Sequence, residues 1–186
     1  MTTAEEQIKE SIETMQRFLS EIPYIEMAAR KVLTALLEGR KVLVCGNGGG
    51  AAESQHIAAE IVGRFRKERK GYPAIALTTD TAILTSLSND YDYSHVFSRQ
   101  VQALGNKGDA LIALSTSGNS LNVLLAAKKA RKMGITVIGF TGKEGGELKG
   151  LCHVCINVAS SNTPRIQECH MMAYHILCEI VDEGLS

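Results

Sequence analysis

His56 and Glu60 are the two residues of this chain whose spacing most directly suggests chemistry. They stand four positions apart in an alanine-rich, helix-prone segment, so the imidazole and the carboxylate share one helix face. A glycine-rich turn, residues 46–50, precedes them and follows an apolar run at 42–44. Glycines let the backbone approach a ligand and point its N–H groups at it. An anion cradle beside an acid/base or metal-binding pair suggests an enzyme acting on a phosphorylated small molecule.

The glycine turn also matches the dinucleotide pattern G-x-G-x-x-A, at residues 46–51. That fingerprint requires an acidic residue about 20 positions further on, at the end of the second strand. The second predicted strand ends at Thr78 and Thr79, and Asp80 lies well past the expected distance. A nicotinamide cofactor is therefore the weaker interpretation.

A second polar loop, residues 115–120 with the sequence STSGNS, favours a single phosphate group as the ligand. A glycine and a helix N-terminus combine there with four hydroxyls to form a compact oxyanion site; the hydroxyls belong to Ser115, Thr116, Ser117 and Ser120. No lysine follows the glycine, so the loop is not the nucleotide P-loop. An N-capped helix with a polar turn is the alternative, and it accounts for Ser120 alone.

The last predicted helix, residues 164–183, supplies the remaining polar candidates. Gln167, Met171 and His175 recur every four residues and trace one stripe. His175 lies among apolar residues and needs a polar partner; with the pair at 56 and 60 it would complete a His/Glu/His set, which is typical of catalytic zinc. Gln167 and His175 are about 12 Å apart along a helix axis, so both reach one ion only with extended side chains or another subunit. For His170 we expect a satisfied core or surface histidine.

Alternating strands and helices position these residues. Strands are predicted at 41–45, 74–78, 109–114, 136–140 and 154–158, and helices at 51–62, 80–88, 96–104, 120–133 and 164–183. Strands this apolar, separated by helices, indicate a parallel sheet covered on both faces, with ligands beyond the carboxyl ends of the strands. Two further helices, 4–20 and 26–38, flank Pro23. Their apolar stripes need a partner, and we expect them to pack against another subunit.

Composition narrows the class of protein. The 186 residues are enough for one domain, and 20 basic residues against 20 acidic ones give no net charge, which argues against nucleic-acid or anionic-membrane binding. The basic cluster at 64–70 is interpreted as a solvated helix end and loop. Neither a membrane-spanning run nor a signal peptide is recognisable, so we expect a soluble, cytoplasmic protein.

Five cysteines, an odd number without secretion signals, indicate reduced thiols. Cys152 and Cys155 have CxxC spacing and could form half of a zinc site or a redox pair. They lie in a predicted buried strand without a second CxxC. We interpret them as structural thiols.

Together these motifs resemble the sugar isomerase (SIS) domain family over nearly the whole chain. The resemblance rests on CGNGG, QHxAAE, RFRKER-x-YPAIAL, the pair Asn89–Asp90, FSRQVxALG, STSGNS, TGKEGG and RIQExH. Within this family, the chain is similar to the branch that converts D-sedoheptulose 7-phosphate to D-glycero-D-manno-heptose 7-phosphate. That reaction is the first step of ADP- or GDP-heptose biosynthesis. The resemblance implies an α/β fold, a SIS-type three-layer sandwich whose central five-stranded parallel sheet is flanked by helices. One SIS domain would span 1–186, with helices of 1–40 used in oligomer packing and an α/β core at 41–186.

The resemblance also implies roles for individual residues. Glu60 and His175 would be the catalytic acid/base pair. One zinc ion per subunit would be held by His56, Glu60, Gln167 and His175. Substrate contacts would come from Asn47, Gly48, Gly49, Glu60, Asn89, Asp90, Ser115, Thr116, Ser117, Ser120 and Gln167. The family forms homotetramers with active sites at subunit boundaries, and the same assembly is implied here.

The implied reaction needs a base, an acid and stabilisation of an enediolate, but no redox cofactor. We expect Glu60 to act as the base and His175 as the acid. Two alternatives from other classes share the scaffold: a non-catalytic tetramer that binds the replication initiator protein, and a domain that senses a sugar phosphate. The first lacks the residues corresponding to this pair and the second has no need of it, so the pair favours the enzyme.

Overall fold

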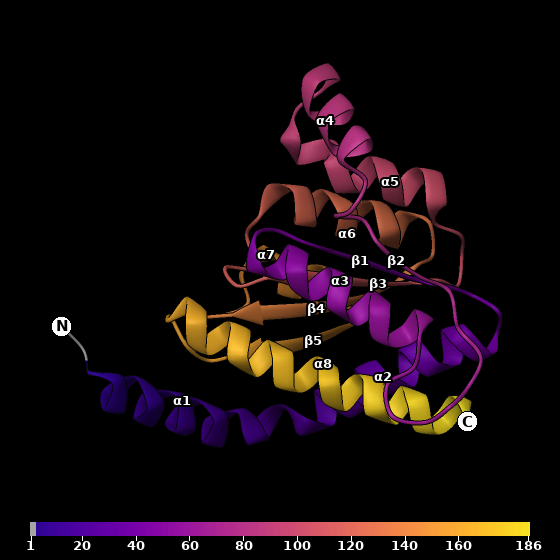
Figure 1. The fold of residues 1–186 in the computed structure, drawn as a ribbon. Helices are drawn as coiled ribbons and strands as arrows, with labels where there is room; N and C mark the ends of the chain where they lie inside the picture. Colours follow the sequence, from indigo (N-terminus) through magenta and orange to yellow (C-terminus); the bar gives the residue numbers. More distant parts are fainter. Residues whose placement is uncertain (1–2) are drawn as a thin grey trace.

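Five apolar strands form a parallel sheet in the order β2-β1-β3-β4-β5 (Figure 1). The computed structural model describes residues 3–186 and places the strands at Val42–Gly46 (β1), Ala74–Ala76 (β2), Ala110–Ser115 (β3), Thr136–Gly142 (β4) and Val154–Val158 (β5). Gly46 of β1 pairs with Leu114 of β3, so the carboxyl ends of these neighbours meet at one edge. The strand order reverses between β1 and β3, and sheets of this kind bind ligands at that point.

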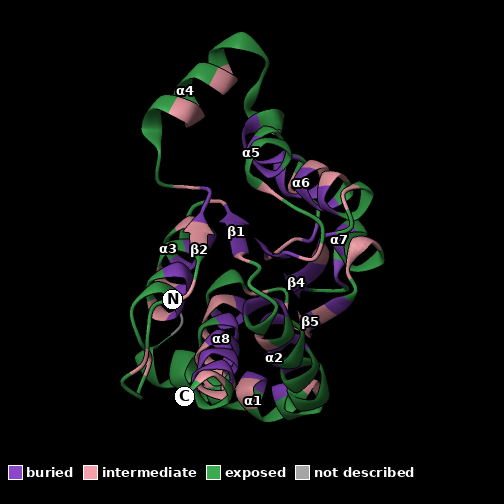
Figure 2. Cartoon of the chain, turned by 90° about the vertical axis from the view of Figure 1, so that its right-hand side faces the viewer, coloured by how far each residue is buried: buried purple, intermediate pink, exposed green. Residues whose placement is uncertain are grey.

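Helices cover both faces of the sheet. Val42 and Val44 point into a core shared with α2 and α8, whereas Leu43 and Cys45 point into a core shared with α5 and α6, as the alternation of side chains along a strand requires. Figure 2 shows the buried sides of these helices turned toward the sheet. The helices are α1 (Ala4–Phe18), α2 (Ile22–Leu37), α3 (Gly49–Val62), α4 (Thr81–Asp90), α5 (Val96–Leu104), α6 (Leu121–Lys132), α7 (Gly146–Leu151) and α8 (Thr163–Leu185), with 3-10 turns at Leu19–Glu21 and Tyr93–His95. The predicted three-layer α/β sandwich is confirmed.

Two details of the prediction are wrong. Helix α2 begins at Ile22 rather than at residue 26, because Pro23 lies in its first turn, where a proline forfeits no helical hydrogen bond. The short helix α7 has no predicted counterpart. Its six residues include Gly146 and Gly150, and glycines weaken any sequence signal for a helix.

The two N-terminal helices differ in how far the chain itself covers them. One face of α2 is buried against α8 and the sheet, while Ile22, Met27 and Leu37 of the same helix are 45%, 41% and 62% exposed. On α1 and the turn after it, Ile8, Ile12 and Leu19 are 61%, 50% and 65% exposed. Both helices therefore keep exposed apolar residues, and their packing against another subunit stays a prediction.

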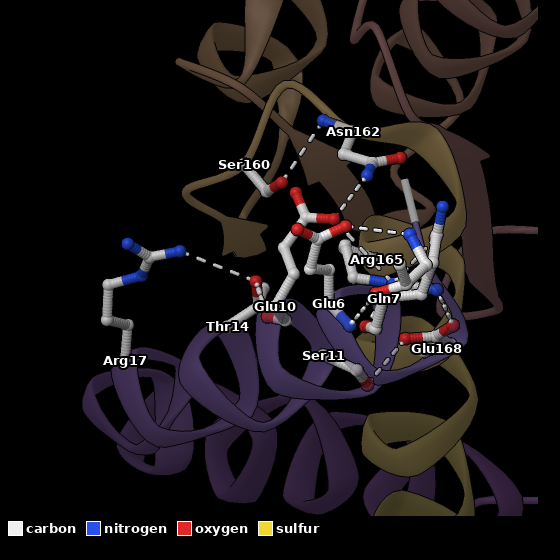
Figure 3. Close-up of polar contacts among 11 residues, drawn as sticks. Glu6, Gln7, Glu10, Ser11, Thr14, Arg17, Ser160, Asn162, Arg165 and Glu168 are labelled. Carbon is white, nitrogen blue, oxygen red and sulfur yellow. Dashed lines mark hydrogen bonds and ion pairs between the residues drawn. The ribbon is translucent and has the colours of Figure 1, made fainter. Parts of the chain in front are cut away.

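Polar contacts attach α1 to the start of α8 (Figure 3). The buried guanidinium of Arg165 donates to the Gln7 carbonyl oxygen at 2.7 Å and pairs with Glu168. The side-chain amide of Asn162, which precedes α8, donates to Glu10 Oε2 at 2.8 Å. These contacts fix the first turn of the helix that carries the C-terminal site candidates.

Part of the basic cluster at 64–70 is a structural tie rather than a solvated loop. The Arg69 side chain is 3% exposed and pairs with buried Asp182 at 2.6 Å. It also donates to the backbone carbonyl oxygens of Glu60 and Ile61, at 3.0 and 3.1 Å, and so secures the end of α3 against α8. Among the described residues, none of the helices combines the length and apolarity needed to cross a membrane.

Candidate active site

The glycine turn after β1 requires glycine for steric reasons. A Cβ on Gly46 would stand 2.7 Å from the Gly50 carbonyl oxygen, and Gly48 has φ of 56°, a left-handed conformation that favours glycine. Helix α3 begins directly after this turn, at Gly49. The turn therefore delivers α3, with its imidazole and carboxylate, to the carboxyl edge of the sheet.

Asn47 ties this turn to the loop after β3. Its amide nitrogen donates to Asn122 Oδ1 at 2.9 Å, and the amide nitrogen of Asn122 donates back to Asn47 Oδ1 at 2.8 Å. Asn122 is 4% exposed and lies in the first turn of α6. The sequence analysis missed Asn122, whose only signal is a polar residue at the start of an otherwise apolar helix.

The STSGNS loop closes a cavity of about 110 Å³ between the ends of β1 and β3. Ser115 Oγ lies 3.0 Å from Ser120 Oγ and 3.4 Å from Ser117 Oγ. Ser120 occupies the N-cap position of α6, yet its side chain makes no capping hydrogen bond. The alternative of an ordinary capped helix therefore fails at the one residue that it explained. The volume corresponds to a few water molecules, the size class of a phosphate group.

Glu53 and His170 line the same cavity. Burial raises the pKa of Glu53 to about 7. His170 is fully buried; its Nε2 donates to the Thr141 carbonyl oxygen at 3.0 Å, and Nδ1 has no hydrogen-bond partner among residues 3–186. Burial lowers the pKa of His170 to about 4, so the ring is neutral at pH 7. We expected a histidine with its hydrogen bonds satisfied, but among the described residues only one of the two ring nitrogens of His170 has a partner.

Glu53 was not singled out in the sequence, although a signal was present. It precedes His56 by three residues and Glu60 by seven, so all three lie on one stripe of α3. A third ionisable residue on the stripe of an alanine-rich helix marks a face that does not pack into an apolar core.

The predicted acid/base and metal candidates of α3 and α8 come together beside this cavity. His56 Nε2 lies 3.0 Å from Glu60 Oε1 and 3.5 Å from His175 Nε2. Desolvation and the neighbouring His56 lower the pKa of His175, against an opposing effect of Glu60. The Tyr174 hydroxyl lies 2.9 Å from His56 Nδ1, a contact that the sequence did not indicate.

Gln167 does not join this cluster. A Cβ on Gly49 would stand 2.1 Å from Gln167 Nε2, so the glutamine reaches the glycine turn. It lines both the small cavity and a groove of about 450 Å³, which it shares with His56. Within residues 3–186, no three or more His, Cys, Asp or Glu side chains are already arranged to hold a metal ion.

Asn89 and Asp90 lie outside both cavities. They end α4, which projects away from the sheet (Figure 1), and the Asn89 amide donates to Asp90 Oδ1 at 3.0 Å. At the other end of α4, the Asp80 carboxylate accepts the Ile83 backbone N–H at 2.9 Å. Asp80 therefore acts as a helix cap, which weakens the dinucleotide interpretation further.

Comparison with known proteins identifies the family of the chain. The SIS domain family model matches residues 6–142. A phosphoheptose isomerase of Clostridium acetobutylicum is 54% identical over 184 residues, which cover 97% of this chain and 94% of the relative. The chain belongs to the phosphoheptose isomerase family of SIS domain proteins. Another phosphoheptose isomerase, from Aliarcobacter butzleri, is 51% identical over 98% of this chain and 93% of its own length.

A solved phosphoheptose isomerase structure shows the same fold. The enzyme from Neisseria gonorrhoeae superposes with a TM-score of 0.91 at 41% identity, covering 97% of this chain and 100% of that one. The phosphoheptose isomerase family thus shares the five-stranded parallel sheet and the flanking helices described above.

Proposed function

We propose that the protein is a phosphoheptose isomerase that interconverts D-sedoheptulose 7-phosphate and D-glycero-D-manno-heptose 7-phosphate, the first step of ADP- or GDP-heptose biosynthesis. One observation carries the proposal: the Glu60 carboxylate and the His175 imidazole meet around His56, beside a hydroxyl-lined cavity of phosphate size. Relatives about half identical over nearly the whole chain bear this enzyme's name.

The chemistry follows from the two side chains. The Glu60 carboxylate takes a proton from C1 of the ketose, and His175 donates a proton to the oxygen on C2, which yields an enediol. Return of the first proton from Glu60 to C2 and transfer of the proton on O1 to His175 give the aldose and restore both side chains, with no net gain or loss of protons or electrons. The hydroxyls of Ser115 and Ser120 would hold the phosphate end of the sugar, and Asn47 with the glycine turn would face its hydroxyls.

One zinc ion per subunit is part of the proposal. His56 Nε2 lies 3.0 Å from Glu60 Oε1 and 3.5 Å from His175 Nε2, and two imidazoles with a carboxylate are a donor set that catalytic zinc sites use. His56, Glu60 and His175 would hold the ion, with Gln167 as a further ligand. When bound, zinc would polarise the substrate oxygen on which charge develops. Metal analysis of the purified protein, with activity measured before and after chelation and after zinc is restored, tests this assignment.

A homotetramer with active sites at subunit boundaries completes the proposal. Its supports are the exposed apolar residues of α1 and the position of Asn89 and Asp90, outside the cavities on a projecting helix. The N-terminal helices would pack between subunits through α1. We place the protein in the cytoplasm, in keeping with the five free cysteines among the described residues.

The decisive experiment supplies sedoheptulose 7-phosphate and measures formation of the aldose by chromatography. We expect turnover by the unaltered protein and a loss of at least about 100-fold in Glu60→Gln and in His175→Gln. Glu68→Gln is the matched control, because that side chain is 88% exposed. No conversion by the unaltered protein would refute the proposal; sugar-phosphate binding alone would then indicate a sensor, and initiator binding the non-catalytic tetramer.

A further inference from the structure

Cys152 and Cys155 converge at the edge strand of the sheet, two strands away from the β3 end of the active site. Both sulfur atoms lie close to the point where a Cβ on Gly139 would stand, at 2.4 and 3.7 Å. Gly139 of β4 is the register partner of Cys155 in β5. The absent side chain therefore leaves a shared space for the two sulfurs.

The two thiols have unequal surroundings. Cys155 Sγ lies 3.2 Å from the Thr141 hydroxyl. Hydrogen bonding from Cys152, together with the charge of Lys149, lowers the pKa of Cys155 to about 7 despite its burial, whereas the Thr141 hydroxyl donates its proton to Asn157 Oδ1 at 2.8 Å. Cys152 Sγ lies 3.1 Å from the Leu148 carbonyl oxygen, and its hydrogen bond to Cys155 and its burial raise its pKa. One sulfur is thus disposed to ionise and the other to keep its proton.

These two cysteines are also the accessible ones. Both are partly exposed and line a cleft of about 280 Å³ beside Glu21 and Lys149. The remaining three cysteines are at most 2% exposed, and burial raises the pKa of each thiol to about 11 or 12; they are Cys45, Cys169 and Cys178. Thiolate character and access decide which cysteines react with oxidants.

We propose that Cys152 and Cys155 form a redox-active dithiol, which a low-molecular-weight disulfide such as glutathione disulfide converts to an intramolecular disulfide. The Cys155 thiolate attacks one sulfur of glutathione disulfide, forms a mixed disulfide and releases one glutathione thiolate. Cys152 then loses its proton to solvent and attacks the Cys155 sulfur, releasing the second glutathione. The dithiol loses two electrons, which reduce one glutathione disulfide to two glutathiones. The site is independent of the isomerase proposal.

The test equilibrates the reduced, full-length protein in buffers of varied glutathione to glutathione disulfide ratio at about pH 7. Free thiols are blocked with N-ethylmaleimide, and intact mass and peptide maps are recorded. We expect a form that carries two fewer maleimide groups, with Cys152 linked to Cys155. In Cys152→Ser the mixed disulfide on Cys155 should accumulate, whereas in Cys155→Ser modification of Cys152 should be at least about tenfold slower.

Two further variants keep the result interpretable. Cys178→Ala removes a buried thiol and should leave disulfide formation unchanged. Lys149→Gln keeps both sulfurs, removes the charge that lowers the pKa of Cys155 and should slow maleimide reaction at Cys155 without preventing it, which remains measurable if a cysteine variant fails to fold. The proposal is overturned if the unaltered protein stays fully reduced at every ratio, if the bond joins other cysteines, or if the Cys152→Ser and Cys155→Ser variants react equally.

Discussion

Tyr174 on α8 contacts one ring nitrogen of His56 on α3, and Glu60 lies at the other ring nitrogen. The Tyr174 hydroxyl lies 2.9 Å from His56 Nδ1, while His56 Nε2 faces Glu60 at 3.0 Å. Burial, followed by the charge of Glu53, raises the pKa of Tyr174 to about 12, so the phenol keeps its proton. Because the partner of one ring nitrogen fixes the state of the other, Tyr174 orients the imidazole and sets which nitrogen faces the substrate side.

Removal of this hydroxyl should weaken the site without disturbing the fold. We expect Tyr174→Phe to lower kcat/KM by about tenfold to 100-fold, and zinc affinity with it, as loss of an orienting partner of a metal-ligating histidine usually does. Steady-state kinetics and metal content measure both effects. Tyr24→Phe, at a tyrosine that is 46% exposed, is the control and should behave as the unaltered protein. Unchanged kinetics in Tyr174→Phe would show that the hydroxyl has no orienting role.

Glu53 should make substrate binding depend on pH. Its pKa of about 7 leaves the carboxyl largely neutral below pH 7 and negative above it, inside the cavity assigned to the phosphate. Repulsion between the two anions should raise KM by about threefold to tenfold between about pH 6 and 8. Glu53→Gln should flatten this dependence, and the exposed Glu183→Gln should retain it. An equally steep pH profile of KM in Glu53→Gln would contradict the prediction.

The parts of the site that could be predicted from the sequence are those that depend on local contacts. The pair at 56 and 60 and the STSGNS loop were recognisable because helix periodicity and loop chemistry act over a few residues. The parallel strands then bring Asn47 and Ser115 to the same edge of the sheet. The five-stranded parallel sheet was predicted correctly, apart from small shifts at the ends of elements.

Contacts between residues far apart in the chain could not be predicted from the sequence. Nothing local indicates that His170 leaves one nitrogen unpaired in a cavity, or that Arg69 is buried against Asp182. The first depends on how α8 packs on β4, and the second on how the segment after α3 packs on α8. Likewise, Cys152 and Cys155 read as core thiols until the strand register placed both sulfurs over Gly139. The distance between Gln167 and His175 along α8 follows from the rise of one helix, and the role of Gln167 as a metal ligand stays a prediction.

His170 should make the fold sensitive to acid. Its pKa is about 4 in the folded protein, against an ordinary value of 6.5. Between these two pH values the imidazole is protonated in the unfolded chain and neutral in the folded one. The stabilisation is fully present above about pH 6.5 and is lost as the pH falls toward 4, by an amount on the order of 3 kcal/mol.

Urea unfolding at several pH values between about 7 and 4 measures this effect. His170→Gln, whose amide can still donate to the Thr141 carbonyl oxygen, should show a smaller loss of unfolding free energy over that range. The exposed His95→Gln should lose as much as the unaltered protein. If His170→Gln and the unaltered protein lose stability in parallel, the buried imidazole does not govern acid unfolding.

Asp90 should contribute to the active site of a neighbouring subunit. It ends a projecting helix and lines neither cavity of its own chain, so a role in catalysis requires a second copy. We expect Asp90→Ala and Glu60→Gln each to be nearly inactive alone. Co-expressed in equal amounts, they should regain about a quarter of the normal activity, because random pairing leaves that share of boundary sites with both residues intact.

Mixing the two proteins after separate purification, without subunit exchange, is the control and should restore nothing. If co-expression restores no activity although mixed oligomers form, Asp90 and Glu60 serve the same subunit, and a boundary site built from these two residues is excluded.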